Sequence, residues 1–294
     1  CYFLNIINIF EWSLTIDALH GALADGQTED IHYINIVAMK NYFDLKGQVA
    51  VVTGASTGLG LQMAKAFANQ GANLVLLARR MNLLEENARI IHEEFGVEVL
   101  PFACDITDTE RVKEAVKATM DKFGRVDILM NNAGTGAVAN AEDITDEQFK
   151  KELDIDLFGT FVCSREFGKE MIKAQYGRII NIASMYGLVG NMIVGSAPYH
   201  AAKGGVVNLT RALAAEWGKH GITVNSICPG YFYTDLTTET LDSDFFQAIA
   251  KRSIPIERYG KSGELDTCAL FLASPASTYV NGQNIAVDGG YTCV

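Results

Sequence analysis

The chain has 294 residues, of which 49% are hydrophobic and 20% are charged, so it is long enough to bury one large core and has the composition of an ordinary folded α/β protein. Its formal net charge of −11 and its pI near 4.9 argue against a general affinity for nucleic acid or for an anionic membrane, since both are negatively charged. We therefore expect neither nucleic acid nor a membrane among its partners.

Residues 1–40 do not share the regular pattern of the rest of the chain. Their first apolar run is about ten residues long before Glu11 interrupts it, whereas a membrane span needs about 20, and it lacks the basic flank of a secretory signal. The simplest interpretation is a non-native or poorly ordered extension, with Met39 as the natural start. A subunit-contact or surface-anchoring segment is the alternative, which nothing in the sequence supports specifically.

The stretch over residues 50–60, AVVTGASTGLG, has the pattern of a buried strand that runs into a glycine-rich turn and then a helix. Gly54, Gly58 and Gly60 let backbone N–H groups approach a pyrophosphate closely, and the N-terminus of the following helix adds partial positive charge. Gly71 is placed to end that helix. The spacing is G-x-x-x-G-x-G rather than the commonest dinucleotide fingerprint, so by itself the stretch is also compatible with a plain structural turn.

From Leu45 onward the chain alternates strands and helices with short connections, which predicts a single doubly wound parallel sheet with helices on both faces. Asn82 and Glu85 have the spacing of a helix cap, and residues 107–110 form a capping box for a helix that Gly124 closes. Residues 231–262 are the least regular part. The expected strands cover residues 73–78, 97–103, 126–130, 178–183, 222–228 and 283–287, and the expected helices cover about 82–95, 107–124, 145–175 and 198–219.

Several polar or glycine-rich segments follow the predicted strands directly. They are the glycine turn, residues 131–134 (NNAG), Ser184 and the pair Pro229-Gly230. In open parallel sheets ligands bind beyond the carboxyl ends of the strands. We therefore expect these segments to converge on one ligand site.

The helix that begins YHAAKGG places Tyr199 and Lys203 four residues apart, so both side chains lie on one face about one turn apart. A neighbouring ammonium favours the phenolate and lowers the tyrosine pKa from its usual value near 10, so that the pair can transfer protons. In isolation such a spacing is more often a chance pair on a solvated helix face.

The combination of motifs is far more specific than any one of them. In chain order it comprises Thr53-Gly54-x-x-x-Gly58-x-Gly60, Asn131-Asn132-Ala133-Gly134, Ser184, Tyr199-x-x-x-Lys203, Pro229-Gly230-x-x-x-Thr234 and the closing VDGG over residues 287–290. From about residue 44 to its end the sequence closely resembles the short-chain dehydrogenase/reductase family. The resemblance implies that residues 41–294 form one Rossmann-type NAD(P)-binding domain that interconverts a secondary alcohol and a ketone.

The resemblance also implies roles for individual residues. Tyr199 exchanges a proton with the substrate oxygen, Ser184 hydrogen-bonds that oxygen, and Lys203 holds the nicotinamide ribose while lowering the tyrosine pKa. Asp105 contacts adenine, and Thr234 meets the carboxamide or the phosphates. The full set of implied cofactor contacts is Gly54, Ser56, Thr57, Gly58, Leu59, Gly60, Arg79, Arg80, Asp105, Ile106, Asn132, Ala133, Gly134, Tyr199, Lys203, Pro229, Gly230 and Thr234.

Asp156 departs from the family pattern. Relatives usually carry an asparagine in a segment like N-L-x-G-x-F, where it supports a water of the proton relay, whereas this chain has Asp156 in D-L-F-G-T-F. An aspartate accepts hydrogen bonds but cannot donate as an amide does unless it is protonated. We therefore include Asp156 among the candidate catalytic residues, with a purely structural role as the alternative.

Cofactor choice depends on the end of the second strand, where an acidic side chain would bind the ribose of NAD and a basic one the 2′-phosphate of NADP. The chain has Ala78-Arg79-Arg80 there and no carboxylate, which favours NADP over NAD. Arg79 is the preferred contact, and Arg80 is either a further contact or only a solvated neighbour. The glycine turn offers Ser56 and Thr57 but no basic residue, which weakens this preference.

The six cysteines are scattered without a C-x-x-C pair or a metal-ligand cluster, so we interpret them as reduced thiols of a cytoplasmic protein that binds no metal. The run SMYGLVGNMIVGSAPYHAAKGG resembles the gluconate 5-dehydrogenase and polyol dehydrogenase branch, which implies a sugar acid, ketose or polyol as substrate. Met185, Asn191 and Tyr231 are candidate pocket residues.

Two other functions remain open from the sequence. A 3-oxoacyl thioester or a hydroxysteroid is the alternative substrate, and a catalytically weak, dinucleotide-binding sensor or scaffold is the alternative of another class. Relatives of this family are commonly homotetramers. The resemblance places the contacts between subunits around residues 145–175, 199–219 and 283–294.

Overall fold

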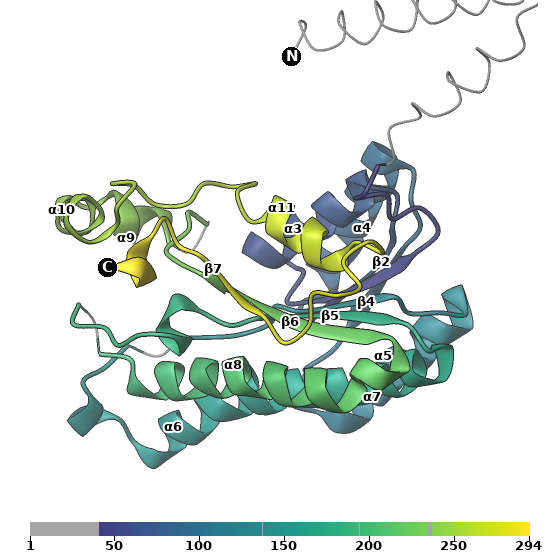
Figure 1. Ribbon diagram of the computed structural model, residues 1–294, viewed down its shortest axis with the longest axis horizontal. Helices are drawn as coiled ribbons and strands as arrows, with labels where there is room; N and C mark the ends of the chain where they lie inside the picture. The colour runs from purple at the N-terminus through teal and green to yellow at the C-terminus, as the bar shows by residue number, and fades with distance from the viewer. Residues whose placement is uncertain (1–40, 137, 194, 235–236) are drawn as a thin grey trace, which may run out of the picture. The chain divides into compact units, whose positions relative to one another are not determined.

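The computed structural model describes residues 41–136, 138–193, 195–234 and 237–294. One compact unit runs from Tyr42 to Val294 (Figure 1). Our interpretation of residues 1–40 lies outside the described residues. In the described part of the chain, no helix is long and apolar enough to cross a membrane.

Seven parallel strands form one sheet in the order β3-β2-β1-β4-β5-β6-β7. The order reverses between β1 and β4, which is where such sheets bind ligands. The expected doubly wound parallel sheet is therefore confirmed. The strands are β1 (Val49–Thr53), β2 (Asn73–Ala78), β3 (Val99–Ala103), β4 (Ile128–Asn131), β5 (Gly177–Ile182), β6 (Ile222–Pro229) and β7 (Asn284–Val287).

Helices cover both faces of this sheet, and its central strands β1 and β5 are buried along their whole length. In Figure 1 the face above the sheet carries α3 (Gly58–Asn69), α4 (Met81–Phe95) and α11 (Asp266–Ala273), and the face below carries α5 (Thr109–Phe123), α7 (Gly159–Ala174) and α8 (Ala197–Trp217). Two large clusters of buried side chains fill the two interlayers. This packing leaves the carboxyl ends of the strands free to build a site.

The ends of helices α4 and α5 show which of the expected capping residues form caps. The capping box expected over residues 107–110 is wrong, because Asp108 is the N-cap of α5 and accepts from the backbone N–H groups of Glu110 and Arg111 at 3.0 and 3.1 Å. Gly124 ends this helix in the left-handed conformation, as expected. Our expectation of a cap at Asn82 is wrong. Helix α4 begins at Met81, one residue earlier, and its N-cap residue Arg80 forms no side-chain cap because a guanidinium has no hydrogen-bond acceptor.

The helical region expected over residues 145–175 is three elements. A capping box between Thr145 and Gln148 starts α6 (Asp146–Leu153), a single π-helical turn η2 (Asp154–Phe158) follows, and α7 completes the region. Such π turns insert an extra residue and often occur at functional sites. Here the turn contains the buried Asp156.

The least regular part of the sequence also contains helices that we did not predict. Helices α9 (Thr238–Asp242) and α10 (Asp244–Ser253) follow β6, and α11 lies beyond them. Both α9 and α10 are short, and the aromatic side chains of Tyr231, Phe246 and Tyr259 hold this region together through edge-on contacts. The region lies beside the carboxyl end of β6.

Candidate active site

The glycine turn after β1 is locked onto the segment after β4. Thr53 Oγ1 accepts hydrogen bonds from the backbone N–H groups of Asn132 and Ala133 at 2.9 and 3.0 Å, and Asn132 Nδ2 donates to Thr53 O at 3.1 Å. A Cβ atom added to Gly60 would lie 2.3 Å from Asn132 Nδ2, and one added to Gly54 would lie 2.8 Å from the same atom. These two glycines are therefore required for the close packing of the two segments.

The third glycine of the turn faces open space. Gly58 has a φ of +61°, and a Cβ atom added there would meet nothing nearer than Thr234 Cγ2 at 3.9 Å. Helix α3 begins at this residue, so its first N–H groups border the same space. The turn thus offers backbone donors and a helix N-terminus to an anion, with Thr234 on its far side. This arrangement fits a dinucleotide pyrophosphate.

Arg80, rather than Arg79, reaches the glycine turn. Its guanidinium Nη2 lies 3.0 Å from Ser56 Oγ and 3.3 Å from Thr57 Oγ1, so Arg80 contacts the turn while it remains exposed to solvent. Ser56 and Thr57 have no basic residue within the glycine turn itself, but the folded chain brings the Arg80 guanidinium to their hydroxyl groups. Arg79 lies on the Asp105 side instead, where its charge contributes to lowering the pKa of that carboxyl.

Local hydrogen bonds or core packing already occupy the side chains of three expected cofactor contacts, Asp105, Ile106 and Leu59. Asp105 Oδ1 accepts from Thr107 N at 3.0 Å and from Thr107 Oγ1 at 2.8 Å, and the backbone bond from Thr107 is the main cause of the lowered pKa of Asp105. The Ile106 side chain is buried against Gly159, and Leu59 packs against the core. Any contact of Ile106 or Leu59 with a cofactor therefore comes mainly from the backbone.

Ser184, Tyr199 and Lys203 lie at the carboxyl edge of the sheet, as the motif order predicts. Ser184 follows β5, and its Oγ accepts from Tyr186 N at 3.1 Å. Tyr199 lies in the first turn of α8, where Pro198 supports the helix start. Lys203 Nζ lies 5.5 Å from the centroid of the Tyr199 ring. The ammonium is thus close enough to act on the tyrosine electrostatically.

Lys203 is buried and doubly anchored. Its Nζ donates to Ile182 O at 3.0 Å and forms an ion pair with Asp156 Oδ1 at 3.0 Å. Burial by itself lowers the pKa of Lys203, but the opposing charges of Tyr199 and Asp156 raise it, and the net shift is upward. Among the described residues, two of the three ammonium protons therefore have partners and one is left for a ligand.

Asp156 lies inside this cluster rather than at its margin. Both of its carboxylate oxygens accept from the backbone N–H of Thr135, at 3.3 and 3.2 Å, and its side chain is fully buried. A Cβ atom added to Gly134 would lie 2.3 Å from Asp156 Oδ1 and 3.3 Å from Lys203 Nζ. The glycine of the NNAG segment is therefore what allows the carboxylate to reach Lys203.

The Pro229-Gly230 pair packs against the closing VDGG segment. Pro229 pairs with Val287 across β6 and β7, and a Cβ atom on Gly230 would lie 2.8 Å from Asp288 Cα. The chain then turns toward Thr234, whose N–H donates to Thr237 Oγ1 at 2.9 Å. The segment after β6 and the C-terminal segment therefore lie against each other here.

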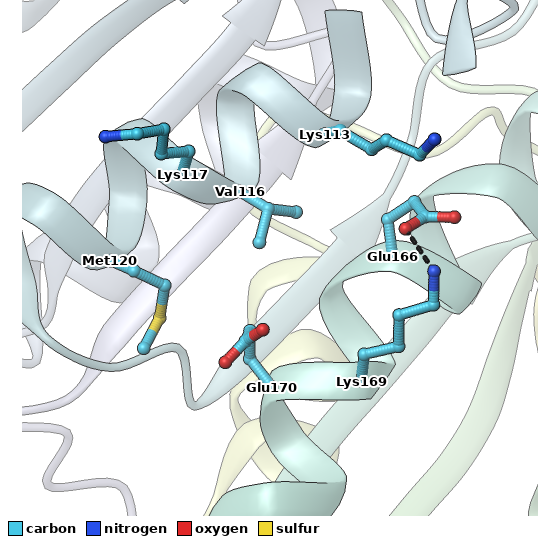
Figure 2. Close-up of a pocket in the computed structure, with 7 residues that line it drawn as sticks. All are labelled: Lys113, Val116, Lys117, Met120, Glu166, Lys169 and Glu170. Atoms are coloured by element: carbon cyan, nitrogen blue, oxygen red, sulfur yellow. Dashed lines mark hydrogen bonds and ion pairs between the residues drawn. The ribbon is translucent and has the colours of Figure 1, made fainter. Parts of the chain in front are cut away.

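A groove of about 370 Å³ lies elsewhere, between α5 and α7 (Figure 2). Its walls are charged, and Glu166 pairs with Lys169 across one turn of α7. None of the candidate site residues lines this groove, so we do not interpret it as the active site. The lining residues are Lys113, Val116, Lys117, Met120, Glu166, Lys169 and Glu170.

Comparison with known proteins identifies the family. A family model described as enoyl-(acyl carrier protein) reductase matches residues 54–292. Galactitol 2-dehydrogenase (L-tagatose-forming) from Cereibacter sphaeroides is 38% identical over 254 residues, covering 86% of this chain and 98% of that protein. The chain is a short-chain dehydrogenase/reductase. It is therefore an oxidoreductase that acts on alcohol and ketone groups.

Solved structures of other short-chain dehydrogenases agree with this assignment. A putative gluconate dehydrogenase from Agrobacterium tumefaciens superposes with a TM-score of 0.82 at 38% identity, over 87% of this chain and all of that one. A gluconate 5-dehydrogenase from Burkholderia cenocepacia in complex with NADP and tartrate gives 0.82 at 33% identity, over 86% of this chain and 98% of that one. The expected Rossmann-type fold is thereby confirmed.

Sequence reasoning missed a cluster of aromatic residues in this short-chain dehydrogenase. The hydroxyl groups of Tyr186 and Tyr231 are in hydrogen-bond contact, and the Tyr186 ring stacks on His200 with centroids 4.6 Å apart. Tyr291 meets both tyrosine rings edge-on at 6.4 Å. The available signal was the recurrence of tyrosine just after strands β5, β6 and β7. Of these three, the sequence analysis singled out Tyr231 alone.

Proposed function

We propose that this enzyme interconverts a secondary alcohol and a ketone on a sugar acid, a ketose or a polyol, with NADP(H) as its preferred cofactor. The observation that carries the proposal is the meeting of Ser184, Tyr199 and Lys203 with the glycine turn at one edge of the sheet. The names of the relatives support the substrate class, since they include a galactitol dehydrogenase and a gluconate 5-dehydrogenase.

The residues present fit a dinucleotide. The open space beside Gly58 and the N-terminus of α3 would take the pyrophosphate. The remaining N–H of Lys203 would hold the nicotinamide ribose. Arg80, Ser56 and Thr57 form a group of donors that matches a 2′-phosphate, and the end of β2 carries no carboxylate that would repel one. The bound cofactor would supply or accept the hydride.

The side chains around the substrate would control its oxygen and its proton. The Ser184 hydroxyl would donate a hydrogen bond to the substrate oxygen and fix its position. The Tyr199 hydroxyl would give its proton to that oxygen during ketone reduction, and its phenolate would take one during alcohol oxidation. Lys203 would stabilise the phenolate through its charge.

The tyrosine cluster supports a hydroxylated substrate. Burial raises the pKa of both Tyr186 and Tyr231, so both keep their protons at neutral pH and can donate as well as accept. Three hydroxyl groups from Tyr186, Tyr231 and Tyr291 therefore lie together on the side of Ser184. Such a wall suits the several hydroxyl groups of a sugar acid or polyol better than an apolar steroid.

The test is a spectrophotometric panel with the purified protein. We expect NADPH-dependent reduction of 5-ketogluconate or ketoses, with lower kcat/KM for an acetoacetyl thioester and for ketosteroids. A preference for the thioester or the steroid would overturn the substrate class. Cofactor binding without turnover across the panel would instead favour a sensor or scaffold.

We also propose a cytoplasmic homotetramer in which residues 41–294 are the catalytic domain. The range matched by the family model, residues 54–292, supports this domain boundary. Exposed aromatic side chains support association, since Phe158 is 43% exposed at the start of α7 and Phe271 is 40% exposed on α11.

A further inference from the structure

The buried ion pair between Asp156 and Lys203 changes the electrostatics of the proton donor. A carboxylate oxygen of Asp156 lies 3.0 Å from Lys203 Nζ, with side-chain exposures of 0% for Asp156 and 5% for Lys203. Charges at such depth are screened little by solvent or salt. The carboxylate therefore cancels much of the field that the ammonium would otherwise exert.

We propose that Asp156 is a positioning residue that acts as the fixed counter-ion of Lys203, so that the ammonium acts on Tyr199 more weakly than it would beside a neutral residue. The inference rests on the proposed role of Tyr199 as proton donor. With a neutral residue at position 156, the full ammonium charge would act on the phenol. With Asp156, Tyr199 faces a neutral pair.

The surrounding chain holds the carboxylate in this place. The π turn η2 directs Asp156 inward, and Thr160 Oγ1 donates to the Asp156 carbonyl oxygen at 3.0 Å. The Thr135 N–H contacts both carboxylate oxygens, and Gly134 leaves room for the pair. Asp156 Oδ1 is thus held in direct contact with Lys203 Nζ.

Other ionisable groups also face Lys203. Glu152 from α6 contributes negative charge, Tyr199 from α8 lies against the ammonium, and Cys228 from β6 is affected by it. Burial raises the pKa of Cys228, so its thiol is neutral in the working range. Glu152 and Asp156 are the two carboxylates of this set, and Asp156 is the one in direct contact with Lys203.

The direct test is the pH dependence of Asp156→Asn. Removing the negative charge strengthens the field of Lys203, so we expect the half-maximal pH of kcat/KM for alcohol oxidation to fall by about one unit. Asp154→Asn is the matched control, because it makes the same change two residues away on an exposed side chain of the same turn. An unchanged profile in Asp156→Asn, or an equal shift in both variants, would overturn the proposal.

A spectroscopic titration separates this proposal from the proposed function. The near-ultraviolet tyrosinate signal of Tyr199 is the difference between each protein and its Tyr199→Phe counterpart, and it needs no substrate. We expect its midpoint to lie at lower pH in Asp156→Asn than in the wild type. Equal midpoints would contradict the counter-ion role even in an active reductase, whereas a shifted midpoint in a protein without turnover would contradict the proposed function alone.

A second pair of variants covers the case in which Asp156→Asn does not fold. Lys203→Met leaves a buried carboxylate without its partner, which is strongly destabilising, and Asp156→Asn/Lys203→Met removes both charges. We expect the double variant to have a higher Tm than Lys203→Met. A double variant no more stable than the single one would show that the two groups do not pair.

Discussion

At the scale of single residues, Arg80 is the side chain that most directly links the fold to cofactor choice. Its contacts with Ser56 and Thr57 place a positive charge beside the glycine turn. We expect Arg80→Ala to raise KM for NADPH at least tenfold, since charge-assisted hydrogen bonds contribute about 1.5–3 kcal/mol, and to leave KM for NADH nearly unchanged. Steady-state kinetics with both cofactors measure this.

Arg79→Ala is the control for that prediction. It removes the same charge one residue earlier, on the side of Asp105. We expect a smaller effect on KM for NADPH than in Arg80→Ala. If Arg79→Ala had the larger effect, the assignment of the 2′-phosphate to Arg80 would be wrong.

The candidate catalytic residues could be predicted from the sequence, whereas the side-chain contacts around them could not. Ser184, Tyr199 and Lys203 stand in recognisable motifs, and parallel strands deliver such motifs to one edge. The direct contact between Asp156 and Lys203 depends on the π turn that contains Asp156 and on Gly134 from the segment after β4. The contact between Tyr186 and Tyr231 joins residues 45 positions apart, which no local pattern encodes.

At the scale of elements, the junction of the glycine turn with the segment after β4 is the most tightly packed part of the site. In Gly60→Ala the new methyl group would meet Asn132 Nδ2 at 2.3 Å and Gly54 O at 2.6 Å. Because such overpacking typically costs about 1–3 kcal/mol, we expect lower stability and weaker cofactor binding. Chemical denaturation and cofactor titration measure the two effects.

A matched glycine substitution distinguishes packing at this junction from a general effect of alanine. A Cβ atom on Gly190 would meet nothing within 4 Å. We expect Gly190→Ala to change the free energy of unfolding by less than about 0.5 kcal/mol. A comparable loss in both variants would argue against the close packing of the turn with Asn132.

Strands and helices with a clear hydrophobic pattern could be predicted from the sequence, whereas the π turn within the active site could not. The strand over Asn73–Ala78 is apolar from its second residue onward and agrees with its predicted bounds. The region over residues 145–175 has helical periodicity along its length, which hides the π turn. That turn contains Asp156, whose contact with Lys203 forms only in the assembled site.

At the scale of the whole molecule, the proposed tetramer can be tested through its exposed aromatic residues. We expect sedimentation at about four times the chain mass of 32.0 kDa. Phe158→Glu places a charge on the long helical region of the proposed interface and should lower this mass. Phe245→Glu, on the 64% exposed Phe245 of α10, is the matched control and should not. A monomeric wild-type protein would contradict the tetramer.

The measurement that tests the account most directly compares NADPH oxidation by the wild-type enzyme and by Tyr199→Phe, with a keto sugar acid as substrate. Loss of a general acid typically costs about 10²–10⁴-fold in rate, and we expect a fall in kcat of this size with NADPH binding retained. Undiminished turnover in Tyr199→Phe would contradict the assignment of Tyr199 as the proton donor and with it the proposed site.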